Sequence, residues 1–371
     1  MIKPLDTQPG PDQPAPASLI AVDRAIAELR RGGVVAVMGE GGAVAHALAA
    51  EAAAPEALAR LAAGGSDLTL AVTGRRARVL GLGAEDQSVA RLTTAGGLTA
   101  ELVAGLADPT RTGPHPDLRA ITAIAQPAQC AVAQAVALAK LARLLPAVVV
   151  AEGGAVGADQ LTVQAAAIAA YQINAARTLR VVSQARVPLA DAENARIIAF
   201  RPADGGIEHL AIVIGEPDCE QPVLARLHSE CFTGDLLGSL RCDCGDQLKG
   251  AIAEIAAAGS GVLLYLAQEG RGIGLVNKLR AYQLQDDGFD TLDANLQLGF
   301  DDDERIYQPA AQMLRLLGIA RVRLLTNNPL KVGALAAHGV EVAERVPHIF
   351  PANDHNTSYL RTKATRGGHL F

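Results

Sequence analysis

The chain has 371 residues, a length that predicts two domains. Half of the residues are hydrophobic and 19% are charged, which favours packed cores and argues against general disorder. The formal net charge of −6 argues against a broad surface for nucleic acid or membranes.

The N-terminus shows no charged and then apolar signal segment, and no apolar run reaches membrane-spanning length. The chain has five cysteines, of which three are clustered. An odd number of cysteines in a chain of this size favours metal binding or catalysis over a disulfide framework. We therefore expect a cytoplasmic protein with no membrane or nucleic-acid partner.

Hydrophobic periodicity divides the N-terminal half into alternating helices and strands. Residues 1–17 are rich in proline and polar side chains and are expected to form a flexible arm. Helices are predicted at 21–32, about 43–63 and 133–145, and strands at 34–37, 68–72, 78–80 and 147–151. A loop and a helix then lead to a domain boundary near 179–194.

Past that boundary the composition changes, because Cys, Asn, Gln, Asp and Arg gather in short motifs. Buried strands are predicted at 262–267 and 322–327, each followed by a turn and a helix. The expected fold class is α/β (α+β), with two domains that each hold a mixed sheet covered by helices. The predicted domains are residues 18–178 and 179–371.

The strongest chemical signal is a cluster of three thiols, Cys231, Cys242 and Cys244. Thiolates are preferred zinc ligands, and three protein ligands leave one coordination position open, as in catalytic zinc sites. The alternatives are three buried, inert cysteines, or a closed structural site completed by Cys219. His228 is a weaker candidate for a ligand, because on a strand it would face away from Cys231.

The residues around the thiols form a series of short motifs that continues to the C-terminus. The first are Arg226-Leu-His-Ser-Glu-Cys231-Phe-Thr-Gly-Asp and Ser239-Leu-Arg-Cys242-Asp-Cys244-Gly-Asp-Gln247. Then follow Gln268-Glu-Gly-Arg271-Gly-Ile-Gly-Leu, Asn277-Lys-Leu-Arg-Ala-Tyr282, Asp290-Thr291, Asn295-x-Gln-Leu-Gly-Phe, Asp303-Glu-Arg305, Leu324-Leu-Thr326-Asn-Asn-Pro-x-Lys331 and Tyr359-Leu-x-Thr-Lys. Together these motifs closely resemble GTP cyclohydrolase II over about 185–371.

The resemblance implies functions for several residues of these motifs. Zinc, one ion per chain, is held by Cys231, Cys242 and Cys244. Asp303 is the general base, and Arg305 is the proposed nucleophile toward the α-phosphate. Residues implied at the GTP site are Arg226, Leu227, His228, Ser229, Glu230, Gln247, Glu269, Gly270, Arg271, Tyr282, Thr291, Thr326 and Lys331. Mg²⁺ is implied as a second cofactor on the triphosphate, and a homodimer is the usual assembly.

Several of these roles have ordinary structural alternatives. An arginine stays protonated and is a poor nucleophile, so Arg305 could instead stabilise charge on the phosphate as a clamp. The acidic run 301–305 could be a solvated loop, and Tyr282 could simply pack in its helix. Glu230 could transfer protons near the reacting carbon or lie exposed at a strand end. The glycine run 270–274 is weak evidence for a phosphate site by itself.

The N-terminal half carries a fainter pattern. Val34-Val-Ala-Val37-Met-Gly39-Glu-Gly41 invites a dinucleotide-binding interpretation, but the third glycine position holds Val44. Apolar positions over about 20–155 resemble 3,4-dihydroxy-2-butanone 4-phosphate synthase. The acidic loop of that family is replaced by residues 38–44, and its Gly-His-Thr-Glu by residues 130–133, which leaves Glu152 as a lone carboxylate. A degenerate, non-catalytic domain kept for folding or dimer contacts is therefore predicted.

The leading hypothesis is a zinc-dependent enzyme that opens the guanine ring of GTP at C8 in riboflavin biosynthesis. The implied products are 2,5-diamino-6-ribosylamino-4(3H)-pyrimidinone 5′-phosphate, formate and pyrophosphate. The alternatives are a GTP-binding regulator without catalysis, a bifunctional enzyme that also makes dihydroxybutanone phosphate, and an enzyme that stops at the formyl intermediate.

Overall fold

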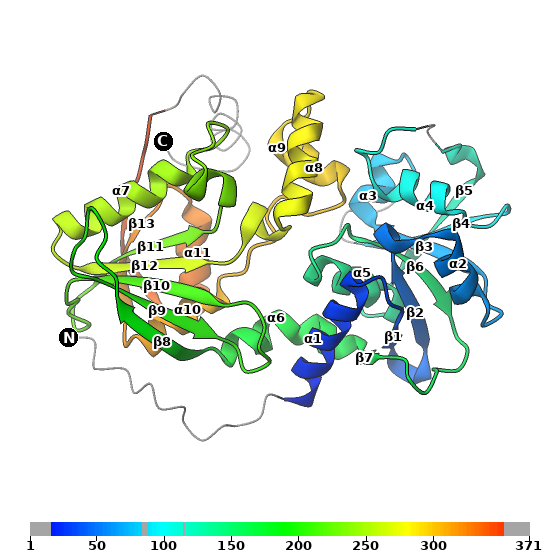
Figure 1. Ribbon diagram of the computed structural model, residues 1–371, viewed down its shortest axis with the longest axis horizontal. Coiled ribbons are helices and arrows are strands. Elements are labelled where there is room, and N and C mark those ends of the chain that lie inside the picture. The colour runs from blue at the N-terminus through cyan, green and yellow to red at the C-terminus, as the bar shows by residue number, and fades with distance from the viewer. Residues whose placement is uncertain (1–15, 84–87, 114–115, 352–371) are drawn as a thin grey trace. The chain divides into compact units, whose positions relative to one another are not determined.

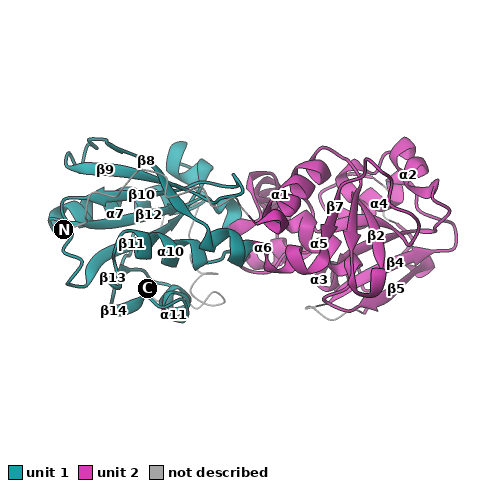
Figure 2. Cartoon of the chain, turned by 90° about the horizontal axis from the view of Figure 1, so that it is seen from below, with its two compact units in different colours: residues 1–15, 172–271, 305–371 teal, residues 16–171, 272–304 magenta. Residues whose placement is uncertain are grey.

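The computed structural model describes residues 16–83, 88–113 and 116–351 (Figure 1). Within them the chain divides into two compact units, coloured separately in Figure 2. Unit 2 comprises 16–171 and 272–304, and unit 1 comprises 172–271 and 305–351 of the described residues. Most of the predicted arm lies outside the described residues, although its last residue, Ala17, already begins a helix.

Unit 2 contains a seven-stranded mixed sheet in the order β5-β4-β3-β6-β2-β1-β7. Its strands are antiparallel except for β1 and β7, which pair in parallel. The strands are β1 Val35–Met38, β2 Val44–Ala49, β3 Leu68–Thr73, β4 Val89–Thr94, β5 Ile121–Gln126, β6 Ala147–Glu152 and β7 Thr162–Gln164. The first helices are α1 Ala17–Arg30, α2 Pro55–Ala62, α3 Gly74–Val79, α4 Ala100–Ala107, α5 Ala131–Leu141 and α6 Ala165–Arg177, and short 3₁₀ turns cover Glu40–Gly42, Ala50–Ala52 and Leu118–Ala120. Two further helices of this unit are α8 Leu275–Asp286 and α9 Thr291–Gln297.

Two apolar clusters cover the two faces of this sheet. One joins α1, α5 and α6 to the sheet through residues such as Val22, Val136 and Ile168. The other joins α2 and α4 to the sheet through residues such as Leu58 and Leu106. Burial of these aliphatic side chains on both faces is the main stabilising contribution in a unit that is poor in aromatic residues.

Two expectations for this half are corrected by the structure. Residues 43–63 do not form one helix, because 44–49 form the buried strand β2 between β1 and β6. Their alanines favour helices intrinsically, but pairing with two neighbouring strands overrides that preference. Residues 78–80 are no strand, since α3 begins after Thr73, whose hydroxyl accepts a hydrogen bond from the backbone of Arg76. Strands β4, β5 and β7 were not predicted.

Unit 1 holds a second seven-stranded mixed sheet in the order β14-β13-β11-β12-β10-β9-β8. Strands β14, β13, β11 and β12 run parallel, and β10, β9 and β8 continue the sheet in antiparallel fashion. The strands are β8 Arg180–Arg186, β9 Ala195–Arg201, β10 His209–Ile214, β11 Val223–Ser229, β12 Gly261–Leu266, β13 Arg321–Leu325 and β14 Glu341–Val346. The helices are α7 Cys244–Ala257, α10 Gln308–Leu316 and α11 Pro329–Ala337, with a π-helical turn at Phe232–Leu236 and a 3₁₀ turn at Glu269–Gly272. The strands predicted at 262–267 and 322–327 are confirmed as β12 and β13.

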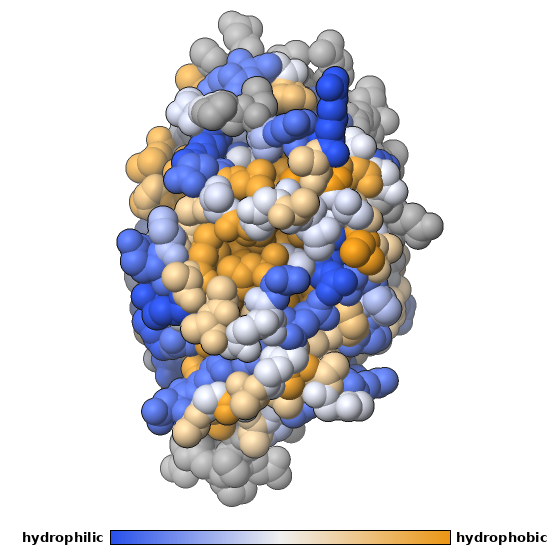
Figure 3. Space-filling view, turned by 90° about the vertical axis from the view of Figure 1, so that its right-hand side faces the viewer, coloured by the Kyte–Doolittle hydropathy of each residue, from blue (hydrophilic) through white to orange (hydrophobic). Residues whose placement is uncertain are grey.

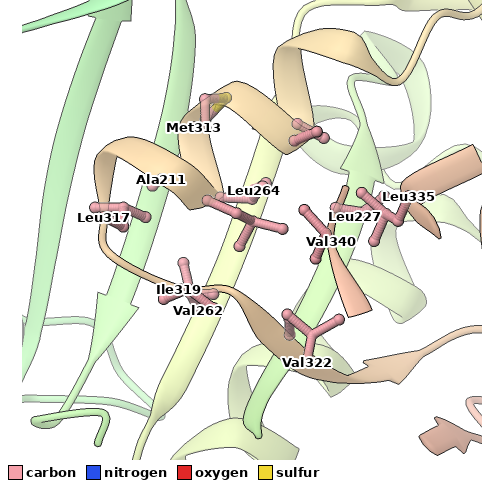
Figure 4. Packing of buried hydrophobic residues seen from close by; sticks show 14 of the residues in the cluster. Ala211, Leu227, Val262, Leu264, Met313, Leu317, Ile319, Val322, Leu335 and Val340 are labelled. Atoms are coloured by element: carbon pink, nitrogen blue, oxygen red, sulfur yellow. The ribbon is translucent and has the colours of Figure 1, made fainter. Parts of the chain in front are cut away.

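Helices cover both faces of the unit 1 sheet. Residues of α10 and α11, such as Met313 and Leu335, pack with Leu227 and Leu264 of the sheet (Figure 4). On the other face, Ala251 and Ile255 of α7 form a smaller cluster with Leu263. The expected fold class, two mixed sheets covered by helices, is therefore confirmed.

Each of the two units is built from separate stretches of the chain, so no single boundary divides them. The N-terminal division falls inside α6, a few residues before the predicted start at 179. In addition, residues 272–304, predicted in the C-terminal domain, belong to the compact unit of the N-terminal half. This division by contacts differs from the predicted division by sequence because α8 and α9 bury their apolar faces with Leu145.

Within the described residues, no helix is long and apolar enough to cross a membrane. Apolar side chains do reach the surface, and Figure 3 shows them gathered in a hollowed central area of one face, with polar residues around it. Larger apolar patches of this kind commonly mark contact sites.

Candidate metal centre and nucleotide site

The three clustered thiols come together in unit 1. Cys231 follows β11, Cys242 lies in the loop before α7, and Cys244 is the first residue of α7. Their Sγ atoms all lie within 4.8 Å of one another, and those of Cys231 and Cys242 are 3.7 Å apart. Two thiolates on a tetrahedral zinc ion are separated by about 3.8 Å, given Zn–S bonds of about 2.3 Å. The geometry therefore fits a zinc ion held by three sulfurs.

Two glycines make room for this cluster. A Cβ atom on Gly234 would lie 2.8 Å from the Sγ atom of Cys242 and 3.1 Å from that of Cys231. A Cβ atom on Gly245 would lie 2.4 Å from the carbonyl oxygen of Gly234. The π-helical turn at Phe232–Leu236 thus packs directly over the thiols, and a side chain at Gly234 would fill that space.

The thiols also perturb one another. Hydrogen bonding with Cys231, together with burial, raises the pKa of Cys242 to about 11 and raises that of Cys244 well above its ordinary value. Three thiols packed this closely disfavour negative charge, and a bound cation reverses that preference. The donor set is thus suited to a thiophilic divalent ion, and among the described residues it comprises these three side chains.

Asp235, in the π-helical turn, binds the backbone of Cys231. Its Oδ2 atom accepts hydrogen bonds from the backbone of Cys231 at 3.0 Å and from the hydroxyl of Tyr265 at 2.9 Å. The Nε2 atom of His228 lies 3.1 Å from both of its carboxylate oxygens. Asp235 was missed as a functional residue, although it stands in the motif that begins at Arg226; its position four residues after Cys231 was the available signal.

His228 is placed away from the thiol group. It is buried, its ring stacks on that of Tyr265, and burial lowers its pKa. Its Nδ1 atom has no hydrogen-bond partner within the described part of the chain. The Nε2 side of the ring thus faces Asp235, and the arrangement leaves the other ring nitrogen for another group.

Glu269 links the turn after β12 to the thiol loop. One carboxylate oxygen accepts a hydrogen bond from the backbone of Phe232 at 2.6 Å, and the other accepts one from Gly270 at 2.8 Å. Gly270 and Arg271 both adopt the left-handed conformation, with φ near 60°. That conformation is costly for a non-glycine residue and is often retained at functional sites.

Buried basic and polar side chains lie on neighbouring elements of unit 1. Arg226 of β11 donates to the carbonyl oxygen of Leu325 at 2.9 Å and to the side chain of Gln247. Lys331 of α11 donates to the carbonyl oxygen of Leu227 at 2.8 Å. Thr326, after β13, accepts a hydrogen bond from Asn328 at 3.0 Å. Burial lowers the pKa of Arg226 to about 10, which still leaves it charged at neutral pH.

The other β11 residues differ in what they can offer a ligand. The side chain of Leu227 is in the core with α10 and α11, so only its backbone could reach a ligand (Figure 4). The hydroxyl of Ser229 is buried without a hydrogen-bond partner among the described residues. Glu230 is half-buried, and its backbone donates to Leu266 at 2.8 Å.

The remaining predicted residues do not all belong to unit 1. Tyr282 of α8, Thr291 at the start of α9 and Asp303 are in unit 2, whereas Arg305 begins the second part of unit 1. Lys278 lies over the ring of Tyr282, with 5.7 Å from its Nζ atom to the ring centroid. Asp303 is exposed and Arg305 is half-buried. The motif at Tyr359 lies outside the described residues.

In the N-terminal half, the residues at the predicted degenerate site have structural partners. Glu152 forms an ion pair with Arg91, and the Cys130 side chain caps α5 by accepting from the backbone of Ala133. Glu40 is exposed. Among residues 16–83, 88–113 and 116–351, one group of three or more His, Cys, Asp or Glu side chains lies close enough to share a metal. That group is the three thiols of unit 1.

Three thiols at the end of a parallel strand, beside buried cations, are typical of a metalloenzyme domain that takes an anionic ligand. A family model described as GTP cyclohydrolase II matches residues 179–347. A protein of Azospirillum brasilense named GTP cyclohydrolase-2 is 58% identical over 367 residues, which cover 96% of this chain and 95% of that protein. The chain belongs to the GTP cyclohydrolase II family, and the resemblance seen in its motifs is confirmed.

Two further relatives match about half of this chain. A GTP cyclohydrolase-2 of Pseudomonas aeruginosa (strain LESB58) is 58% identical over 172 residues, which cover 46% of this chain and 84% of that protein. A riboflavin biosynthesis protein RibBA of Cytophaga hutchinsonii is 53% identical over 175 residues, 47% of this chain and 43% of its own length. A solved structure of RibBX, a two-domain 3,4-dihydroxy-2-butanone 4-phosphate synthase from A. baumannii, is 20% identical with a TM-score of 0.34, covering 90% of this chain and 99% of that one. With a score that low, the resemblance of the N-terminal half to such synthases stays a prediction.

Proposed function

We propose that the chain is a zinc-dependent GTP cyclohydrolase II. It hydrolyses GTP at guanine C8 and at the α–β phosphoanhydride, and the products are 2,5-diamino-6-ribosylamino-4(3H)-pyrimidinone 5′-phosphate, formate and pyrophosphate. The observation that carries the proposal is the group of three Sγ atoms within 4.8 Å in a chain of this family. Names among the relatives support a place in riboflavin biosynthesis.

Cys231, Cys242 and Cys244 would hold the zinc ion. When bound, zinc supplies a Lewis acid and lowers the pKa of a coordinated water toward neutrality. The protein contributes the positioning of its sulfurs: Asp235 holds the backbone of Cys231, and Glu269 holds that of Phe232. These contacts restrict the loop that carries the first ligand, as outer partners of metal ligands commonly do.

The triphosphate would be bound by the basic residues of unit 1, with Mg²⁺ as its counter-ion. Arg226 and Lys331 are buried cations that donate hydrogen bonds to the carbonyl oxygens of Leu325 and Leu227. Such cations favour an anionic ligand. The hydroxyl of Ser229 and the free ring nitrogen of His228 are polar groups that a ligand could satisfy.

Asp303 and Arg305 are assigned to the phosphate side of the reaction. Arg305 acts either covalently on the α-phosphate or as a clamp that stabilises its charge. Replacement of Arg305 by alanine is expected to abolish pyrophosphate release in both cases. Trapping a phosphoramidate adduct supports the covalent role, and repeated failure to trap it with active enzyme supports the clamp.

The test is to measure zinc content and products on the same purified chain. One zinc per chain, loss of GTP absorbance and formate release that a chelator stops are expected, with the ring-opened product identified by mass. Binding of GTP without turnover would identify the regulator instead. A formylated product would identify an enzyme that stops at the intermediate.

The N-terminal half is proposed to have no synthase activity. Glu152 is engaged in an ion pair with Arg91, and the Cys130 side chain caps α5. Both residues lie at the positions that correspond to the synthase site, and both are engaged in structural contacts. Incubation with ribulose 5-phosphate and Mg²⁺ should yield no dihydroxybutanone phosphate. Formation of that product would instead show a bifunctional enzyme.

A homodimer is also proposed. The loop that follows Cys231 exposes three leucines, Leu236, Leu237 and Leu240, each more than half exposed in the single chain. Exposed apolar groups of this size are commonly covered by a partner. Light scattering after size exclusion should give twice the chain mass, and a monomer mass would contradict the assignment.

A further inference from the structure

The segment 272–304 is held by the N-terminal half of the chain. It lies within the residues that match the GTP cyclohydrolase II family, yet it belongs to compact unit 2 (Figure 2). Helix α9 packs against α8 and against α3. Leu145 joins Ile273, Leu284, Leu298 and Phe300 in one buried apolar cluster. The segment thus shares a core with the N-terminal half, and it carries Tyr282, Thr291 and Asp303.

Side chains of the N-terminal half also bind the backbone of this segment. The hydroxyl of Thr73 donates to the carbonyl oxygen of Gly299 at 2.7 Å. Arg76 is buried and donates to the carbonyl oxygen of Gln297 at 2.8 Å. A Cβ atom on Gly299 would lie 2.8 Å from the Thr73 hydroxyl, so the approach is close. These bonds fix the end of α9.

The beginning of the segment is fixed in the same way. The side chain of Asn277 donates to the backbone of Arg143 at 3.1 Å, and a Cβ atom on Gly274 would lie 3.0 Å from the Cβ atom of Arg143. Arg280 forms ion pairs with Glu51 and Asp108 at 3.2 and 3.3 Å. Helix α8, which carries Tyr282, is therefore attached to the N-terminal half along its length.

The loop that carries Asp303 is bound by two cations of the N-terminal half. Arg75 lies 2.5 Å from Asp301, and Lys140 lies 3.3 Å from Asp301 and 2.7 Å from Glu304. Glu304 also accepts a hydrogen bond from the backbone of Asp301 at 2.7 Å. The network thus holds the residues on both sides of Asp302 and Asp303.

We infer that the N-terminal half serves the proposed GTP reaction as a scaffold, in which Arg75 and Lys140 are positioning residues for the Asp303 loop. The inference rests on the proposed function, because it takes Asp303 as a residue that acts on GTP. Arg75 and Lys140 act through Asp301 and Glu304, and no contact of theirs with substrate is required.

Positioning explains this network better than stability does. Asp301 is 37% exposed and Lys140 is 23% exposed, and an ion pair this open to water adds little to the stability of a fold. The same pairs restrict a loop that has no helix or strand of its own between Phe300 and Tyr307. A small displacement of a reacting group can cost a large factor in rate even when the change lies far from the chemistry.

The experiment compares full-length variants Lys140→Met, Arg75→Met and Asp301→Asn with the native chain. We expect kcat for formate release to fall by about tenfold to a hundredfold in each, with zinc content and Tm retained. Lys140→Arg should recover most of the rate, because it keeps the charge. The pH profile of kcat should shift in the methionine variants, because the environment of Asp303 changes.

Arg91→Met is the matched control, since Arg91 and Glu152 form another ion pair of unit 2 that does not contact the segment 272–304. Its kcat should equal that of the native chain. The inference is overturned if Lys140→Met and Asp301→Asn keep kcat within twofold. It is also overturned if the rate of Lys140→Met or Asp301→Asn falls only in proportion to the folded protein that is lost. A similar fall in Arg91→Met would likewise show that the effect is one of stability and not of positioning. If the native chain itself releases no formate, the proposed function fails, and that outcome is distinct from both.

Discussion

The carboxylate of Asp235 accepts a hydrogen bond from the backbone of Cys231 at 3.0 Å and another from the hydroxyl of Tyr265 at 2.9 Å. Cys231, the first proposed zinc ligand, is therefore linked through Asp235 to Tyr265 of β12. Replacement of Asp235 by asparagine should lower zinc affinity by about tenfold or more, because the amide cannot accept all of these bonds. Competition with a chromogenic chelator measures the affinity. Glu344→Gln, which breaks an exposed ion pair with Arg323 in the same unit, is the control and should retain native affinity.

Each of the three thiols should be required for metal and for ring opening. Serine at Cys231, Cys242 or Cys244 should reduce zinc to well below one ion per chain and lower formate release by at least roughly a hundredfold. Cys219→Ser is the matched control, because its half-exposed thiol stands apart from the group. Normal ring cleavage by the serine variants would contradict the proposed chemistry.

A methyl group at Gly234 should disrupt the metal site without a change in any ligand. The Cβ atom of Gly234→Ala would lie 2.8 Å from the Sγ atom of Cys242 and 2.9 Å from the Cβ atom of Cys244. We expect zinc content and activity to fall together while the far-ultraviolet dichroism stays native. Gly333→Ala in α11, where a Cβ atom meets nothing within 4 Å, should be neutral or stabilise by about 0.5–1 kcal/mol. Full zinc occupancy in Gly234→Ala would show that the turn can move away.

The stability of the chain should decrease in weak acid. Burial lowers the pKa of His228 and of His348. In the unfolded chain both return to a pKa of about 6.5, so below that pH the unfolded state binds protons that the folded state excludes. The stability contributed by the neutral rings is thus complete above about pH 6.5 and is lost as the pH falls through the lowered values.

His348→Gln should flatten this dependence. The Nε2 atom of His348 lies 2.9 Å from the carbonyl oxygen of Gln247, a bond that the glutamine amide can replace. Urea unfolding at several pH values measures the effect. The free energies of unfolding of the variant and the native chain should differ by a constant amount above about pH 7.5 and should converge below it. An unchanged slope would show that His348 does not contribute.

The candidate site could be predicted to different degrees in its different parts. The thiols were identified from their spacing, because three soft ligands within fourteen residues have few other uses. Asp235 was missed because a carboxylate four residues beyond a ligand has no signature until its partners, His228 and Tyr265, are brought beside it. Leu227 was predicted at the GTP site from its position in the motif. Its side chain is buried in the apolar core, which the motif does not reveal.

The amino-acid sequence alone determined the family, the clustering of the three thiols and the strands β1, β3, β6, β12 and β13, because these depend on local patterns of side chains. It did not determine that 44–49 form a strand, since alanine favours helices until neighbouring strands pair with it. Only the tertiary structure decided that residues 272–304 join the N-terminal half. That outcome depends on contacts such as Thr73 with Gly299 and Arg75 with Asp301, which join residues 226 positions apart and leave no periodic trace in the sequence.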